Sequence, residues 1–390
     1  MTGEYYKHVN FDMKLVDLRV MILAIVFLLL WPLKAISQNL AKKKIFPQQR
    51  NYQKIDSLMS KFTAWLSASL ISFASQTLTT GSFSDKIEYE YKFNFIAHSE
   101  VCMATIASLS AFQEVSLPQG TVRYSDQGTG PMLVFIHGLL ANRLLWSRVI
   151  PQLVSHFRCI APDLPLGAHS HPFPPDVDLS PLGVAHLVAD FLEACDLHEI
   201  TLIGNDTGGA ICQLVIAHHP ERITRLVLTN CDAFEQFFPP LVSPFYYGAR
   251  VFGIQFANFL AWVLRARSAQ RLFVAALSHR RPGPAELDAA FHPLLHLPGV
   301  RSDMTRFLRA VSNRYTLEAA QTFSSFHHPV LLVWGKDDPF FSSRLAVRLQ
   351  QAFPDATLQF LPHSRAFVQL DQPEVFAQQI TEFVHAAVDA

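Results

Sequence analysis

The pattern of apolar and polar positions changes in character near residue 112. From there, short apolar runs typical of strands alternate with stretches of helical periodicity. Strands are predicted at residues 115–117, 120–124, 132–136, 158–161, 200–203, 226–229, 329–334 and 357–361, and helices at 145–154, 182–195, 210–217, 343–353 and 375–388. Strands that alternate with helices predict an α/β fold with a mostly parallel sheet and right-handed crossovers.

The alternation stops after the sixth predicted strand. Residues 233–328 are rich in Phe, Leu, Ala and Arg, and they show helical periodicity over 246–265, 269–277 and 301–315. An insertion of this size predicts a helical cap. The α/β core is then expected to consist of residues 112–232 and 329–390.

The most hydrophobic stretch of the chain lies before this core. In the first segment, residues 1–50, the run from Val20 to Leu33 is almost uninterrupted by polar residues, and basic residues follow it. It fits a signal peptide with a small-residue cleavage site at Ala35, or a signal anchor that associates with a membrane and leaves the main domain on the cytoplasmic face. An ordinary buried helix, or an extension from a misplaced start codon, is the third interpretation. Residues 51–111 show only a weak pattern and receive no assigned function.

The charge, cysteine and histidine content of the chain argues against several classes of function. The formal net charge is zero and no long basic stripe occurs beyond residues 42–54, which argues against a nucleic-acid partner. The five cysteines are odd in number and widely spaced, so they indicate buried thiols in a reducing compartment and favour the anchor over the signal peptide. The scattered histidines show no spacing typical of metal ligands, and neither a metal nor a cofactor is predicted. Nothing in the composition indicates an oligomeric state.

One short motif organises the functional interpretation. A β-rich run ending at Ile203 leads directly into Gly204-Asn205-Asp206-Thr207-Gly208-Gly209, and a buried helical stretch follows. Small residues two positions before and after Asp206 allow a strained strand-turn-helix in which this side chain stands clear, the geometry of a nucleophile elbow. A carboxylate there would attack carbon and form an ester. The competing interpretation is an ordinary turn with Asp206 as a helix N-cap.

The order of further motifs resembles the α/β-hydrolase superfamily over residues 112–390, and within it the branch with an aspartate nucleophile that contains haloalkane dehalogenases and epoxide hydrolases. The matching features are His137-Gly138, Pro162-Asp163, the Asp206 elbow, the cap after the sixth strand, and Trp334-Gly335-Lys336-Asp337-Asp338-Pro339. The resemblance implies a hydrolase acting on a small apolar substrate, such as a haloalkane, an epoxide or an ester.

The resemblance also implies roles for individual residues. Asp206 is the nucleophile, and the backbone N–H groups of Leu139, in the His137-Gly138 loop, and of Thr207 form the oxyanion hole. Asp338 is the acid of the triad, in preference to its neighbour Asp337.

The family's general base is missing from its expected position. That base is a histidine just before an aromatic residue and a downstream Asp-x-Pro-Glu, and counting back from Asp371 places the position on Ala366. Alanine cannot accept a proton. His363 lies three residues upstream and would serve only if the loop were remodelled. Two readings therefore stay open: an active hydrolase, or a pseudoenzyme or ligand-binding protein of the same fold.

Other departures bear on the substrate. Dehalogenases of this kind usually carry halide-donating Trp and Asn side chains where this chain has Thr207 and Leu139. Cap tyrosines that protonate an alkoxide in epoxide hydrolases have candidates in Tyr246, Tyr247 and Tyr315. A membrane-tethered scaffold in which residues 1–110 matter most is the weakest alternative.

Overall fold

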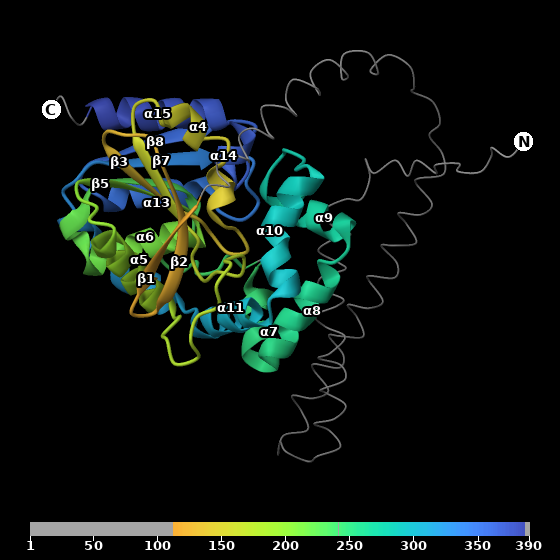
Figure 1. Ribbon diagram of the computed structural model, residues 1–390. Coiled ribbons are helices and arrows are strands. Elements are labelled where there is room, and N and C mark those ends of the chain that lie inside the picture. Colours follow the sequence, from red (N-terminus) through yellow and green to blue (C-terminus); the bar gives the residue numbers. More distant parts are fainter. Residues whose placement is uncertain (1–111, 241, 387–390) are drawn as a thin grey trace, which may run out of the picture. The chain divides into compact units, whose positions relative to one another are not determined.

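The structure is a computed structural model that describes residues 112–240 and 242–386 (Figure 1). The apolar run from Val20 to Leu33 and the other expectations for residues 1–111 lie outside the described residues. Of the helices in the described ranges, none is both long enough and apolar enough to cross a lipid bilayer.

The described residues form an eight-stranded sheet in the order β1-β2-β4-β3-β5-β6-β7-β8. Its strands are β1 (Gln113–Leu117), β2 (Gly120–Gln127), β3 (Met132–Ile136), β4 (Arg158–Pro162), β5 (Ile200–Asp206), β6 (Ile223–Cys231), β7 (Val330–Gly335) and β8 (Ala356–Leu361). Strand β2 pairs antiparallel with β1 and β4, and the remaining pairings are parallel. The predicted α/β fold with a mostly parallel sheet is confirmed.

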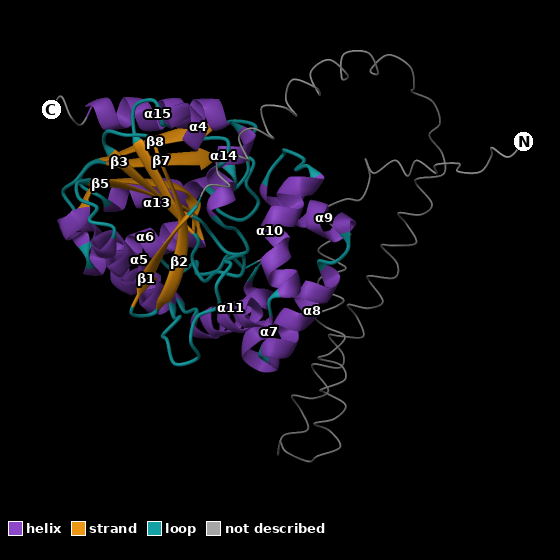
Figure 2. Cartoon of the chain, in the orientation of Figure 1, coloured by secondary structure: helices purple, strands orange, loops and turns teal. Residues whose placement is uncertain are grey.

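Helices lie on both faces of the sheet. The core helices are α4 (Ile150–Leu153), α5 (Pro181–Ala194), α6 (Thr207–His218), α13 (Ser343–Ala352), α14 (Val368–Asp371) and α15 (Pro373–Ala386). Figure 2 shows α4 and α15 on one face and α5 and α6 on the other. Strands covered on both faces bury nearly every side chain, which explains why β3 and β7 are continuous apolar runs without alternation.

The single helix predicted over 145–154 is wrong in detail. The structure has a short 3₁₀ helix at Arg143–Trp146, capped by the Asn142 side chain, and α4 begins separately at Ile150. Pro151 stands in the first turn of α4. Proline fits a first turn because it has no N–H to donate to a preceding turn, so it favours a new helix over the continuation of an old one.

The cap consists of six helices between β6 and β7: α7 (Ser243–Phe252), α8 (Ile254–Val263), α9 (Arg267–Leu277), α10 (Pro284–His296), α11 (Pro298–Ala310) and α12 (Asn313–Ala320). The helix expected over 246–265 is broken at Gly253, whose φ of 56° ends α7 and starts α8. Glycine adopts this left-handed conformation at little cost. Helix α10 was not predicted, because Pro293 lies inside it and interrupts the sequence signal.

A buried polar cluster joins the cap to the core. His169, in the loop after β4, places its Nε2 3.0 Å from Asp303 of α11, and Arg306 donates to the other carboxylate oxygen at 2.6 Å. Arg306 also donates to the carbonyl oxygens of Pro174 and Val177 in the same loop. The cluster therefore fixes α11 against the loop that follows β4.

Candidate active site

The backbone at Asp206 has the strained conformation that the sequence predicts. Its φ of 55° and ψ of −131° lie in a region that residues with a side chain rarely adopt, and the register of β5 against β6 shifts between Asn205 and Asp206. Close packing allows this turn. A Cβ on Gly208 would lie 2.4 Å from the carbonyl oxygens of Ile136 and His137, so only glycine lets α6 start this near β3.

The Asp206 side chain is presented to the site and does not cap its own helix. No side-chain hydrogen bond caps α6, and Asp206 keeps part of its surface accessible although its neighbours are buried. The Leu139 N–H donates to Oδ2 of Asp206 at 3.1 Å. Gly138 lies against the same carboxylate, because a Cβ there would come within 2.2 Å of Oδ2. This arrangement excludes the N-cap interpretation.

The carboxylate of Asp206 is difficult to ionise. Burial raises its pKa to about 7, although hydrogen bonds from the Thr207 and Leu139 N–H groups act in the opposite direction. The negative charge of Asp338 raises the pKa further. Near neutral pH this side chain therefore exchanges its proton, and only its ionised form can act as a nucleophile.

The side chains of Asp338 and Asp337 differ in burial and in their hydrogen-bond partners. Asp338 is held by its neighbours: the Phe340 N–H donates to Oδ1 at 2.8 Å, and the Asn230 side-chain amide donates to Oδ2 at 2.6 Å. Burial raises the pKa of Asp338 to about 6, despite these hydrogen bonds. Asp337 is exposed and contacts His279 at 3.0 Å. Of the two candidates, Asp338 is thus the one whose charge acts on Asp206.

A third carboxylate, not predicted from the sequence, belongs to the same site. Asp232 follows directly after β6 and is fully buried, and the Thr207 hydroxyl donates to its Oδ2 at 3.4 Å. Burial, and then the charge of Asp206, raise the pKa of Asp232 well above its usual range. Its Oδ1 is buried without a hydrogen-bond partner. In the sequence, the available signal for Asp232 was an acidic residue directly after the predicted strand that follows the Asp206 motif.

The loop after β8 brings Ala366 to the site and leaves His363 outside it. Ala366 is fully buried, and its carbonyl accepts a hydrogen bond of 2.8 Å from the side chain of Asn205, the residue before Asp206. His363 has a φ of 54° and an exposed side chain. Within the described residues, no hydrogen bond or ion pair joins its ring to Asp206 or Asp338. The expected relay through His363 is not formed in this structure.

The two other histidines near the site are already engaged. The Leu164 N–H donates to Nε2 of His137 at 2.8 Å, so Nδ1 carries the proton and donates to the Gly138 carbonyl at 2.9 Å. Burial lowers the pKa of His137 to about 4, and the ring is neutral. His169 contacts Asp303 in the cap. His137 therefore orders the oxyanion-hole loop, and neither ring is available to Asp206 as a base.

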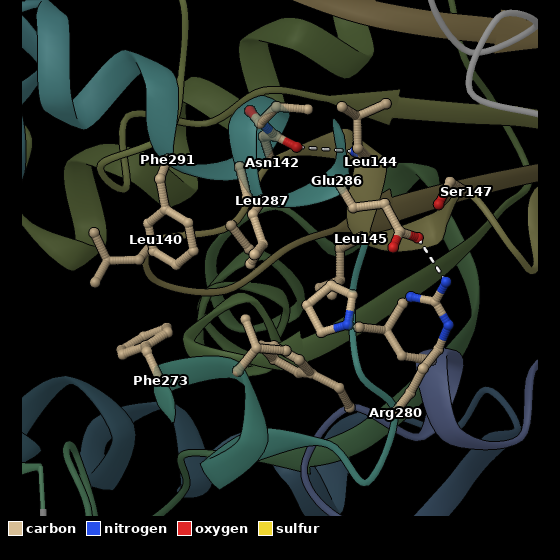
Figure 3. A pocket seen from close by; sticks show the side chains of 17 residues that line it. Leu140, Asn142, Leu144, Leu145, Ser147, Phe273, Arg280, Glu286, Leu287 and Phe291 are labelled. Atoms are coloured by element: carbon tan, nitrogen blue, oxygen red, sulfur yellow. Dashed lines mark hydrogen bonds and ion pairs between the residues drawn. The ribbon is translucent and has the colours of Figure 1, made fainter. Parts of the chain in front are cut away.

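A cavity of about 90 Å³ lies between the cap and the core, and Asp206, Asp232 and Asp338 are not among the residues that line it (Figure 3). Leu140 and Phe367 line it, and each directly follows a site residue, Leu139 or Ala366. From the cap, Phe273 of α9 and the side chains of Leu287 and Phe291 of α10 close it. Figure 3 shows the ion pair of Arg280 and Glu286, 2.8 Å long, at one side of this space. The walls are mostly apolar, which suits a small apolar group.

The cap tyrosines do not gather at Asp206. Tyr247 is exposed on α7, and Tyr246 packs against Phe238 and Arg250. Tyr315 packs beside Arg314 at the start of α12. The described residues contain no group of three or more His, Cys, Asp or Glu side chains arranged to hold a metal ion.

The comparisons with known proteins agree with this fold. A family model described as the alpha/beta hydrolase fold matches residues 131–373. Haloalkane dehalogenase 2 of Mycobacterium tuberculosis strain H37Rv is 28% identical over 276 residues, which span 68% of this chain and 91% of the relative. An uncharacterized hydrolase of Bacillus subtilis strain 168 is 25% identical over 256 residues, with coverages of 65% and 89%.

Solved structures show the same architecture. The haloalkane dehalogenase DbeA from Bradyrhizobium elkani superposes with a TM-score of 0.61 at 16% identity, covering 72% of this chain and 99% of that one. An alpha/beta hydrolase fold protein from Burkholderia ambifaria gives a TM-score of 0.61 at 21% identity, with coverages of 69% and 97%. The chain belongs to the α/β-hydrolase fold family. Among its members it is similar to haloalkane dehalogenases.

Proposed function

We propose that Asp206 attacks a carbon atom of a small apolar substrate that carries a leaving group, and that the resulting ester is long-lived. The carbon–halogen or epoxide carbon–oxygen bond breaks as the new carbon–oxygen bond forms, and the leaving group departs with its electron pair. The observation that carries the proposal is the Asp206 carboxylate, held out of its helix by the elbow and fixed by the Leu139 N–H.

The second step would be slow. Hydrolysis of the ester needs a base that takes a proton from water as it attacks the carboxyl carbon of Asp206. We assign the oxyanion donors for that step to the N–H groups of Leu139 and Thr207, because both donate to the Asp206 carboxylate. We assign no base among the described residues, because Ala366 occupies the family position and His363 is exposed. Loss of one member of such a triad typically reduces the rate by about 10⁴-fold or more.

The surroundings of Asp206 favour some leaving groups over others. The Thr207 hydroxyl donates to Asp232, and Leu139 contributes only its backbone, so neither side chain stabilises a departing halide. Good leaving groups such as bromide and iodide should therefore react faster than chloride. The apolar cavity beside Leu140 and Phe367 suits a short alkyl chain.

Mass spectrometry of the intact protein tests the first step. Incubation with 1-bromohexane should add the mass of one hexyl group, and peptide mapping should place it on the peptide that contains Asp206. The matched control is Asp206→Asn, which keeps the shape of the side chain but removes the nucleophile. Absence of an adduct on wild-type protein across bromoalkanes, iodoalkanes and epoxides would refute the proposal.

A ligand-binding protein without chemistry is the second candidate. The raised pKa of Asp206 and the alanine at 366 favour it, because a protonated carboxyl group does not attack carbon and no base stands at the family position. In that case a haloalkane would raise the melting temperature of the protein reversibly, and dialysis would restore the original mass and melting temperature. The mass experiment separates the two candidates.

A further inference from the structure

Two cap helices expose large apolar side chains to solvent. Seven large hydrophobic side chains are exposed among the described residues, and four of them lie within 16 positions of α7 and α8. Trp262 is 62% exposed, Val251 61%, Tyr247 56% and Ile254 38%. Apolar side chains this exposed and this close in sequence are unusual for a surface that only meets water, and they mark contact sites.

The same part of the cap is positively charged. Residues 236–285 contain six arginines and no Asp or Glu, whereas the whole chain has no net charge. Acids of α10 pair with two of them, Arg267 with Asp288 and Arg280 with Glu286. Arg265 and Arg271 are exposed, and no described acid pairs with either of them. We call the exposed side chains of Tyr247, Val251, Ile254, Trp262, Arg265 and Arg271 the basic cap face.

The position and the charge of the basic cap face favour an anionic lipid bilayer over a second copy of the chain as its partner. Figure 1 shows α8 and α9 on the side of the cap away from the sheet, while the apolar cavity lies between the cap and the core. A second copy of this chain would bring arginines against arginines, and like charges oppose association. Amphipathic helices with Trp on an apolar face, arginine beside it and no acid bind the interface of anionic bilayers.

We propose that the basic cap face docks on the surface of an anionic lipid bilayer. The side chains of Trp262, Val251 and Ile254 enter the boundary between head groups and acyl chains, and Arg265 and Arg271 contact the lipid phosphates. The docking is independent of the chemistry at Asp206 and of the apolar run from Val20 to Leu33.

Fluorescence quenching by brominated lipids tests the position of Trp262. Full-length protein is mixed with vesicles of phosphatidylcholine and phosphatidylglycerol in equal parts, with brominated or ordinary acyl chains. Of the five tryptophans, Trp146 and Trp334 are fully buried in the core, and Trp31 and Trp65 are present in both proteins. We therefore expect the part of the emission that is lost in Trp262→Phe to be quenched by bromolipid. Equal quenching of the two proteins would overturn the proposal, because bilayer contact would then come only from elsewhere in the chain.

Charge variants test the role of the arginines. Binding to the same vesicles, measured by flotation, should weaken about fivefold with each of Arg265→Gln and Arg271→Gln, because one basic residue near an anionic surface contributes about this factor. The matched control is Arg344→Gln, which removes an exposed arginine from α13 in the core and should change nothing. Equal effects of all three variants would show nonspecific attraction and contradict the proposal.

Sedimentation velocity and iodide quenching without vesicles test whether the basic cap face is instead covered by a second copy of the chain or by another segment of the same chain. A monomer in which iodide quenches Trp262 is the expected result. A dimer that dissociates on Trp262→Ala would assign the face to a second copy, and a monomer in which Trp262 is shielded from iodide would assign it to another segment of the same chain. Either result would overturn docking on lipid.

Discussion

At the scale of single residues, the candidate site is a group of three carboxyl groups, those of Asp206, Asp232 and Asp338, in which the charge of Asp206 acts on Asp232 and that of Asp338 acts on Asp206. Among the described residues, no hydrogen bond or ion pair joins a histidine ring to any of the three. A protonated histidine would stabilise the ionised form of Asp206 and lower its pKa. In its absence burial dominates, and the pKa of Asp206 rises to about 7. The carboxyl group of Asp206 is therefore only partly ionised at neutral pH.

This pKa predicts how the rate of alkylation depends on pH. The ionised carboxylate attacks and the protonated one does not, so the rate should rise with pH and level off above about 7. Single-turnover labelling with 1-bromohexane, followed by mass spectrometry between pH 5 and pH 9, measures it. A rate that is constant over this range would show that Asp206 ionises at its ordinary pKa and that burial has little influence.

The close approach of Gly138 to the nucleophile gives a second prediction. A Cβ at this position would lie 2.2 Å from Oδ2 of Asp206, so Gly138→Ala must move the carboxylate or the loop. We expect labelling to fall by at least about 10²-fold, since loss of one oxyanion-hole donor costs this much. Gly283→Ala, at an open position before α10, is the control and should label normally. Normal labelling of Gly138→Ala would contradict the assigned geometry.

At the scale of elements, the strands followed from the sequence more reliably than the cap. Continuous apolar runs fix β3 and β7 because helices cover both faces of the sheet. Helical periodicity in the cap does not show where one helix ends and the next begins, since the break at Gly253 interrupts no hydrophobic repeat. Asp232 was missed for a related reason: its place in the site depends on β6 lying next to β5, which the sequence does not state.

The junction between the loop after β4 and α11 offers a stability test. Burial alone would raise the pKa of Asp303, but hydrogen bonds from His169 and Arg306 lower it below its ordinary value. Its carboxylate therefore stabilises the fold above the pKa of an unfolded aspartate, and this contribution is lost as pH falls through the lower, folded pKa. Asp303→Ala should cost about 1–3 kcal/mol at pH 7, because it leaves the buried His169 ring and the Phe173 N–H without their acceptor.

Urea unfolding at pH 7 and at acidic pH measures this contribution. The difference between wild type and Asp303→Ala should shrink in acid, where the carboxyl group is protonated in both states. Asp355→Ala removes an exposed aspartate from the turn before β8, and it should have almost no effect at either pH. If the two variants lost equal stability, the cluster would have no special role in holding the cap.

At the scale of the whole molecule, the buried carboxyl group of Asp206 makes the folded state less stable when it is ionised. The folded state binds a proton at Asp206 that the unfolded chain has already released between about pH 4 and pH 7, so stability falls as pH rises through this window. Asp206→Asn removes the buried charge. We expect its melting temperature to exceed that of wild type by a few degrees at pH 8, and by about zero at pH 4, in differential scanning calorimetry. A variant that is less stable than wild type at pH 8 would contradict the electrostatic account.

The motifs of the sequence already indicated the family. In both the sequence and the structure, the open question about the reaction is the base that would activate water, because alanine stands at position 366. The strained turn at Asp206 and the proximity of Leu139 and Asp338 to it could be predicted from motifs, because the spacing within each motif is local and the turns need particular small residues. Whether another histidine replaces the missing base could not be read, since that depends on the path of the loop after β8. The structure buries Ala366 beside Asn205 and leaves His363 exposed.

The lifetime of the Asp206 ester tests the central claim most directly. Protein labelled with 1-bromohexane is freed of reagent, and its mass is followed over time for wild type, His363→Ala and Ala366→His. We predict that the adduct persists equally in wild type and His363→Ala, whereas Ala366→His loses it and releases hexanol. Rapid loss of the adduct from the wild-type protein would contradict the account, because it would show that a working base faces Asp206 after all.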